Sequence, residues 1–159
     1  MNPYVVIDIG GTSIKYGLAD AKGQLLETHE MPTEAQKGGP HILNTTKEIV
    51  ARYLKKHPLA GVAISSAGMV DPDKGEIFYA GPQIPNYAGT QFKKEIETSF
   101  NIPCEIENDV NCAGLAEAVA GSGKGASVTL CLTIGTGIGG CLIMDGKVFH
   151  GFSNSACEV

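Results

Sequence analysis

The sequence predicts an α/β fold in which helices flank a mixed sheet. Three observations lead to this class. A β-branched apolar run opens the chain, two strand-like segments follow it as a meander, and segments of helical periodicity then alternate with further apolar runs. A strand that follows a crossover helix usually lies parallel to its neighbour. A meander joined to such a crossover therefore predicts strands of both directions in one sheet.

The first predicted elements build this sheet. Residues 4–9 form an apolar run that two glycines end, and residues 14–19 and 24–31 predict two more strands with the turn DAKG between them. The apolar positions of residues 42–56 recur at helical spacing, which predicts a helix. Residues 59–68 (LAGVAISSAG) predict a buried strand parallel to the first.

The next segments continue the alternation. MVDPDKGEIFYAG predicts a small hairpin, and TQFKKEIETSF predicts a helix with Thr90 as its N-cap. PCEIEN predicts a short strand, and a helix is expected over residues 108–121. After the loop GSGKGA, residues 128–134 alternate in strand period, break at glycines and resume as a strand before a turn at residues 145–146.

Two parts of the chain repeat one pattern. Residues 8–20 (DIGGTSIKYGLAD) and 133–145 (TIGTGIGGCLIMD) both predict a strand, a glycine turn, a second strand and an aspartate before another turn. Their identity is low, but the elements follow at one constant offset. Either a βββα-type half is duplicated, or two hairpins resemble one another by chance.

Composition excludes several classes of function. The chain of 159 residues is 43% apolar and 18% charged with a net charge of −5, which fits a globular domain and disfavours nucleic-acid binding. The five cysteines are odd in number and form no CxxC pair, so we expect a reduced, cytoplasmic setting. No run approaches the ~18 apolar residues that a membrane span needs, and no basic leader precedes the first strand.

The two glycine turns are candidate phosphate sites. Glycines let backbone N–H groups face an anion without a Cβ in the way. Thr12, Thr136 and Lys15 can add donors and charge, and the Asp8 carboxylate can hold Mg²⁺ through water. Two tight hairpins without any ligand remain the alternative.

Two further glycine patterns do not fit nucleotide-binding motifs. Gly135, Gly137 and Gly140 spell G-x-G-x-x-G, but a strand pattern follows where the dinucleotide fold needs a helix. The stretch GSGKGA resembles a P-loop, yet Gly125 follows Lys124 where a Ser or Thr must bind magnesium. We therefore predict a hairpin and a solvated loop.

The segment ENDVNC is the candidate catalytic site. Asn108 and Asp109 end a strand and begin a helix, so the carboxylate is either a helix cap or a general base for a substrate hydroxyl that Asn108 helps to orient. Asp71 competes for the base role, although PDKG after it favours a turn. Gly68, at a strand end, suits a polyol ligand or a plain turn, and Glu158 alone carries no signal.

Five motifs together resemble the ROK family of sugar kinases and repressors, which belongs to the actin and hexokinase superfamily. They are DIGGTSIK, ISSAGMVD, ENDVNCAGLAE, LTIGTGIGGCLIMDGKVFHG and ACE, and they occur in the family's order. The resemblance implies an RNase H-like domain over residues 1–118 and the first hairpin strands of a second such domain over 119–159. It implies transfer of the ATP γ-phosphoryl group to a sugar hydroxyl, most often the 6-hydroxyl of a hexose, as in a glucokinase.

The resemblance also implies roles for residues. Asp109 would be the catalytic base, Mg²⁺ would lie near Asp8, and Asn108 and Glu158 would bind the sugar beside Gly68. The phosphates of ATP would lie between the two glycine turns, with these residues around them: Asp8, Gly10, Gly11, Thr12, Lys15, Thr133, Gly135, Thr136 and Gly137.

The sequence departs from the family pattern in two ways. Cys157 replaces the glycine of the usual AGE, and the chain stops at Val159, before the adenosine pocket and an often present cysteine-rich zinc site. We therefore expect a fragment of a protein about twice as long, a homodimer or homotetramer when complete, and little kinase activity from residues 1–159 alone. The alternatives are a sugar-responsive repressor, for whose helix-turn-helix no room precedes Asp8, and a sugar-binding protein without catalysis.

Overall fold

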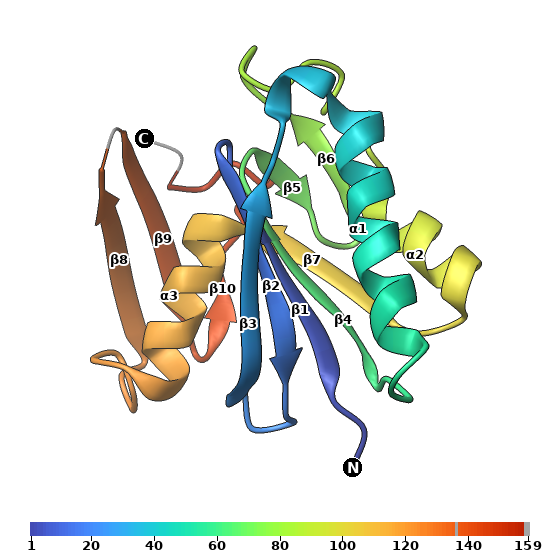
Figure 1. Cartoon of the computed structure of the whole chain (residues 1–159). Coiled ribbons are helices and arrows are strands. Elements are labelled where there is room, and N and C mark those ends of the chain that lie inside the picture. The colour runs from blue at the N-terminus through green and yellow to red at the C-terminus, as the bar shows by residue number, and fades with distance from the viewer. Residues whose placement is uncertain (136, 158–159) are drawn as a thin grey trace. The chain divides into compact units, whose positions relative to one another are not determined.

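A computed structural model describes residues 1–135 and 137–157 of the chain (Figure 1). Packing divides it into two compact units, Met1–Glu107 and Asn108–Val159. The domain boundary expected between residues 118 and 119 from the family resemblance is a different division, and it stays a prediction. The units are described one at a time.

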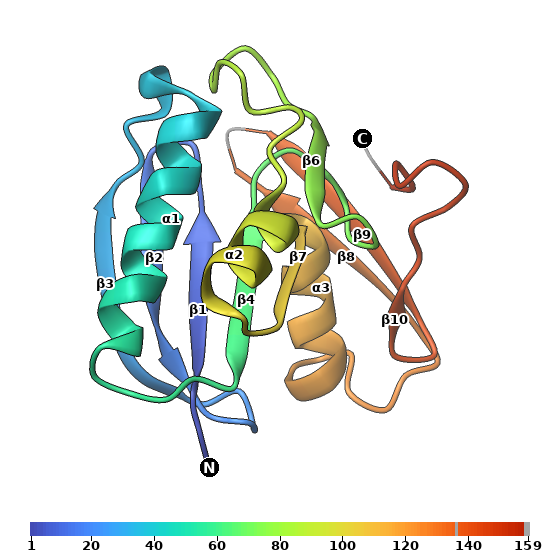
Figure 2. The same cartoon turned by 90° about the vertical axis from the view of Figure 1, so that its right-hand side faces the viewer.

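The first unit is built on a mixed sheet of five strands in the order β3-β2-β1-β4-β7 (Figure 2). Strand β1 is antiparallel to β2 and parallel to β4, and β2 is antiparallel to β3. This is the predicted meander followed by a parallel strand after a crossover helix. The strands are β1 (Tyr4–Ile9), β2 (Ser13–Ala19), β3 (Leu25–Pro32), β4 (Gly61–Ser66) and β7 (Cys104–Asn108).

Helices α1 (Gly39–Leu54) and α2 (Phe92–Phe100) lie on the same face of this sheet (Figure 2), and a short 3-10 turn, η1 (Ala35–Lys37), precedes α1. Lys47 of α1 forms a 2.9 Å ion pair with Glu95 of α2. Apolar side chains from the strands and from both helices pack together in one core. Its fully buried members include Val5, Ile9, Ile14, Ile42, Ile49, Val50, Phe92 and Ile96.

The N-cap predicted for α2 is wrong. The helix begins at Phe92, its N-cap is Gln91, and Gln91 makes no side-chain cap bond. The Thr90 hydroxyl instead donates to the Tyr87 carbonyl at 2.6 Å. The Thr90 side chain thus bonds back into the preceding turn, whereas a cap must accept from an N–H of the helix.

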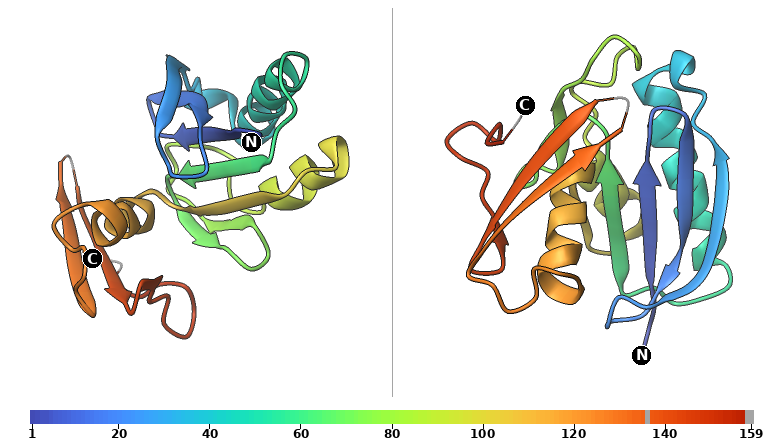
Figure 3. Two further views of the ribbon diagram at one scale, coloured as in Figure 1. Left: turned by 90° about the horizontal axis from the view of Figure 1, so that it is seen from below. Right: turned by 90° about the vertical axis from the view of Figure 1, so that its left-hand side faces the viewer.

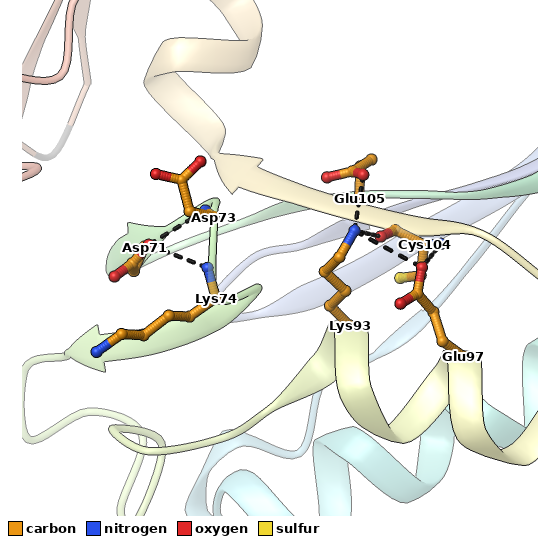
Figure 4. A network of polar contacts seen from close by, with 7 residues as sticks. All are labelled: Asp71, Asp73, Lys74, Lys93, Glu97, Cys104 and Glu105. Carbon is orange, nitrogen blue, oxygen red and sulfur yellow. Dashed lines mark hydrogen bonds and ion pairs between the residues drawn. The ribbon is translucent and has the colours of Figure 1, made fainter.

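A separate two-stranded hairpin, β5 (Met69–Asp71) and β6 (Glu76–Tyr79), follows β4. Its turn is held by Asp71, whose Oδ1 accepts from the N–H groups of Asp73 and Lys74 at 3.1 and 3.2 Å (Figure 4). This confirms the turn role expected for Asp71.

Lys93 of α2 joins that helix to β7. Its ammonium donates to the Cys104 carbonyl at 2.9 Å and to Glu105 at 2.7 Å, and lies 3.6 Å from Glu97 (Figure 4). The hydrogen bond to Glu105 raises the pKa of Lys93. These contacts fix the edge strand against the helix.

In the second unit, α3 (Asp109–Ala120) packs on a three-stranded antiparallel sheet of order β10-β9-β8 (Figure 3). Two glycines allow the close approach: a Cβ at Gly114 would lie 2.5 Å from the Cys141 sulfur, and one at Gly123 2.7 Å from the Thr129 hydroxyl. The strands are β8 (Val128–Ile134), β9 (Ile138–Met144) and β10 (Lys147–Val148).

The β8–β9 hairpin has one covered and one open face. Alternate residues of β8 are partly buried on the α3 side, whereas Val128, Leu130, Leu132 and Ile134 are exposed. Within the described ranges, no helix combines the length and apolar character of a membrane span.

The sequence repeat is also a structural repeat. Strand β1 ends at Ile9 and β2 begins at Ser13, while β8 ends at Ile134 and β9 begins at Ile138, at the same offset. The registers differ by one residue, since Ile9 pairs with Ile14 but Ile134 pairs with Ile138. Four residues therefore separate the last pair of the first hairpin, and three separate the last pair of the second.

Candidate functional site

The predicted site residues of the first unit gather where β1 and β4 end. Ile9 is in register with Ser66, and the Ala67 N–H donates to the Ile9 carbonyl at 2.9 Å. The chain then turns at Gly68, whose φ of 90° favours glycine. The glycine turn after β1 and the turn at Gly68 after β4 are thus direct neighbours, as expected at the carboxyl edge of parallel strands.

The turn at residues 10–13 offers backbone N–H groups to an anion. The Gly10 N–H donates to the Ser13 carbonyl at 3.0 Å and closes the turn. Within residues 1–135 and 137–157, the N–H groups of Gly11 and Thr12 have no acceptor. Both residues are exposed, and a Cβ at Gly11 would meet no atom within 4 Å. Unpaired N–H groups beside open space are what a phosphate cradle requires.

Asp8 and Lys15 lie opposite each other on β1 and β2, and both are exposed. In the described part of the chain, no ion pair involves either of them. A carboxylate and an ammonium beside an anion-binding turn fit a phosphate chain and its magnesium, because Mg²⁺ prefers carboxylate and phosphate oxygens with water.

In the second unit, Asn108 caps α3. Its Oδ1 accepts from the N–H groups of Val110 and Asn111 at 3.0 and 3.2 Å. The Val110 N–H also reaches Oδ1 of Asp109 at 2.9 Å. The cap is therefore Asn108, and the Asp109 carboxylate is the first helical residue, where the helix dipole favours a negative charge.

The N-terminus of α3 packs against the turn end of the β8–β9 hairpin. A Cβ at Gly139 would lie 2.5 Å from Val110 and 2.6 Å from the hydroxyl of Thr133, so only glycine permits this contact. Thr133 and Gly139 are paired across the two strands, next to the turn that contains Gly135. The fold thus places Asp109, which precedes Val110, at the end of the hairpin that carries the second glycine turn.

The ACE segment returns to the same hairpin. A Cβ at Gly140 would lie 2.8 Å from the Cys157 carbonyl, so the backbones are close. Cys157 itself has φ 60°, a left-handed conformation that favours glycine. The glycine that the family resemblance implies at this position would adopt this conformation without strain, whereas a cysteine is strained in it. The site predictions for Thr136 and Glu158 fall outside the described residues.

The remaining motif predictions have plain outcomes. Strand β9 begins at Ile138, within the G-x-G-x-x-G spelling, and contains Gly140, so no dinucleotide-binding helix begins there. Lys124 lies in a turn after α3. The described residues contain no group of three or more His, Cys, Asp or Glu placed to hold a metal ion.

Sequence reasoning missed two buried residues behind the first half of the site. Thr33 is fully buried and donates its hydroxyl to the Gly10 carbonyl at 2.7 Å. Tyr87 is also buried, and its hydroxyl lies 2.5 Å from that of Ser66, the last residue of β4. A threonine after a strand and a tyrosine in a loop have no periodic signal, so only long-range contacts reveal them.

The sequence profile of the ROK family matches residues 4–159. The chain belongs to the ROK family. It is 56% identical to CPE0188, an uncharacterized protein of Clostridium perfringens, over all of this chain and 54% of that protein. It is 32% identical to a glucokinase of Halalkalibacterium halodurans, over 98% of this chain and 48% of the enzyme.

A solved structure of a ROK family member has the same fold as this chain. The ROK family glucokinase of Streptomyces griseus, in complex with glucose and AMPPNP, aligns with a TM-score of 0.84 at 31% identity over 98% of this chain and 49% of the enzyme. The predicted actin and hexokinase type of fold is confirmed. The chain spans about half the length of the curated ROK relatives it matches.

Proposed function

We propose that the complete ROK protein phosphorylates a sugar, transferring the γ-phosphoryl group of ATP to a hydroxyl, with the 6-hydroxyl of a hexose as the preferred acceptor. One observation carries the proposal: the N-terminus of α3, with Asp109, packs at the turn end of the β8–β9 hairpin. Relatives named glucokinase and a neighbour bound to glucose and AMPPNP support it.

The glycine turns would bind the terminal phosphates of ATP. The exposed N–H groups of Gly11 and Thr12 supply donors, and Lys15 supplies positive charge. Asp8 would hold Mg²⁺ through water, and the bound ion would neutralise charge on the phosphates. We propose that the second glycine turn also contacts these phosphates, through Thr133, Gly135, Thr136 and Gly137.

Asp109 would act as the general base. Its carboxylate accepts the proton of the sugar hydroxyl while that oxygen attacks the γ-phosphorus, and the bond to the Val110 N–H holds its Oδ1 in place. Asn108 would contact the sugar through its amide nitrogen, because its Oδ1 caps α3. Gly68 and Glu158 would complete the sugar site.

The test is a coupled assay on the full-length protein with ATP, Mg²⁺ and a panel of hexoses. Asp109→Asn keeps the shape of the side chain but removes the base, so we expect kcat to fall about 10³-fold. Asp71→Asn is the matched control, because Asp71 only holds a turn, and it should keep wild-type activity.

Two outcomes would contradict the proposal. Equal activity of wild type and Asp109→Asn would remove the base from Asp109. If wild type phosphorylates no sugar while the Asp109→Asn variant still binds one, the protein is a sugar sensor or a binding protein.

A further inference from the structure

Thr33 binds the first glycine turn from behind. It directly follows β3, and none of its surface is exposed. Its hydroxyl donates to the Gly10 carbonyl at 2.7 Å, and its backbone N–H donates to the Thr12 carbonyl at 2.9 Å. Two carbonyls of the turn are therefore fixed by one residue that lies outside the hairpin.

Fixing a carbonyl also fixes the next N–H group. The peptide unit is planar and trans, so its C=O and N–H point in opposite directions. Because the Gly10 carbonyl points at Thr33, the Gly11 N–H must point away from Thr33. The same argument applies to the Thr12 carbonyl and the Ser13 N–H. Gly11 is exposed, and in the described residues its N–H has no acceptor, so the group is available to an anion.

We propose that Thr33 is a positioning residue for nucleotide phosphates: it orients the peptide unit between Gly10 and Gly11 so that the Gly11 N–H is preset for the β- and γ-phosphates. This inference rests on the proposed kinase function. A preset donor pays no ordering entropy when the anion binds, which strengthens the interaction. Without this anchor, the two glycines would lose their conformational freedom when the phosphate binds, and glycine loses more of it than any other residue.

Threonine suits this role for a physical reason. A β-branched side chain has few χ1 rotamers, so its hydroxyl stays directed at one acceptor. Valine has the same shape without the donor, and serine keeps the donor without the methyl group. The pair therefore separates the hydrogen bond from packing.

The test uses the full-length protein and two readouts. Thr33→Val should weaken ADP and ATP binding about tenfold and raise KM for ATP by a similar factor, because one oriented hydrogen bond is lost. AMP, which lacks the β- and γ-phosphates, should bind with unchanged affinity, and KM for the sugar should not change. Thr33→Ser should restore the affinity for ADP to within about twofold.

Thr46→Val is the matched control. Thr46 is also a fully buried threonine, and its hydroxyl donates to the Ile42 carbonyl at 2.9 Å inside α1. This variant makes the same chemical change away from the turn, so it should alter stability without altering nucleotide affinity.

Unchanged ADP and ATP affinity in Thr33→Val, with only a lower melting temperature, would overturn the proposal and leave Thr33 a purely structural residue. An equal loss for AMP and ADP would overturn it as well. If Thr33→Val does not fold, Thr33→Cys replaces it, since a thiol is a weak donor, and the same ADP-to-AMP comparison decides. Wild type that binds ADP but phosphorylates no sugar would refute the proposed function, while the ADP and AMP measurements would still judge Thr33.

Discussion

The two glycine hairpins share their strand pattern and differ in their surroundings. Ile9 ends β1 and none of its surface is exposed, whereas Ile134 ends β8 at the same offset and is 82% exposed. Local sequence determines that both segments form a strand, a turn and a strand. Burial of a hairpin residue depends on the elements that pack on the hairpin. Equivalent residues can therefore contribute very different free energies to stability.

The anchoring of the turns differs too. Strand β3 pairs with β2 along the whole length of Ser13–Ala19 and brings Thr33 to the first turn. In the second unit, β10 pairs only with Met144 and Ile143, at the end of β9 that lies away from the turn. The first turn is therefore held by a neighbouring strand that the second turn, in the described residues, does not have.

The largest expected effect compares the equivalent isoleucines in the chain 1–159. Ile9→Ala should lower the free energy of unfolding by about 3–4 kcal/mol, because it leaves a cavity in a buried core. Ile134→Ala should lower it by less than about 0.5 kcal/mol, because its side chain is already in water. Urea unfolding of both variants measures the difference.

Equal costs for the two substitutions would break the comparison. They would show that the open face of the β8–β9 hairpin is covered in solution. Repeating the Ile134→Ala measurement at two protein concentrations detects whether a second copy of the chain covers it.

A pH series on Cys104 tests how well water is excluded from the first unit. Burial raises the pKa of this thiol from 9.0 to about 12. The unfolded chain loses the thiol proton near its ordinary pKa while the folded chain keeps it. The stabilisation from the neutral thiol is thus complete below pH 9 and is lost as the pH rises toward 12.

The Cys104→Ala variant lacks this titration. The stability gap between wild type and Cys104→Ala should therefore shrink by about 2–3 kcal/mol between neutral pH and pH 11. Urea unfolding at both pH values measures the gap in the full-length protein. A constant gap would show that water reaches the thiol in the native state.

The smallest effect compares two helix starts. Asn108→Ala removes both cap bonds of α3 and should cost about 1 kcal/mol, together with part of the catalytic rate, because Asp109 loses a fixed neighbour. Gln91→Ala at the start of α2 removes no cap bond and should stay within about 0.5 kcal/mol of wild type. Thermal unfolding of both variants gives the ranking, and a reversed order would contradict it.

Much of the fold could be predicted because its signals are local. The glycine turns, the alternation of β8 and the helix that follows Asn108 are all encoded within a few residues, and the structure confirms them. The cap prediction for Thr90 is wrong because its side chain bonds back to the Tyr87 carbonyl and does not accept from an N–H of the helix. A local rule cannot decide whether a threonine just before a helix bonds forward to the helix or back into the preceding turn.

The residues behind the site could not be predicted for a different reason. Thr33 meets Gly10 across 23 residues of sequence, and Tyr87 meets Ser66 across 21. Such contacts exist only after the sheet and its loops are assembled. The roles of Asp8 and Asp109 stay predictions, since they depend on ligands and not on packing.

Continuity of the first unit has a consequence for biosynthesis. Its strands all come from residues before α3, and β7 is the last of them to leave the ribosome. Domains commonly fold in order as they are synthesised. The growing chain can therefore complete the first core, with Thr33 and the glycine turn in place, while the second hairpin is still being translated.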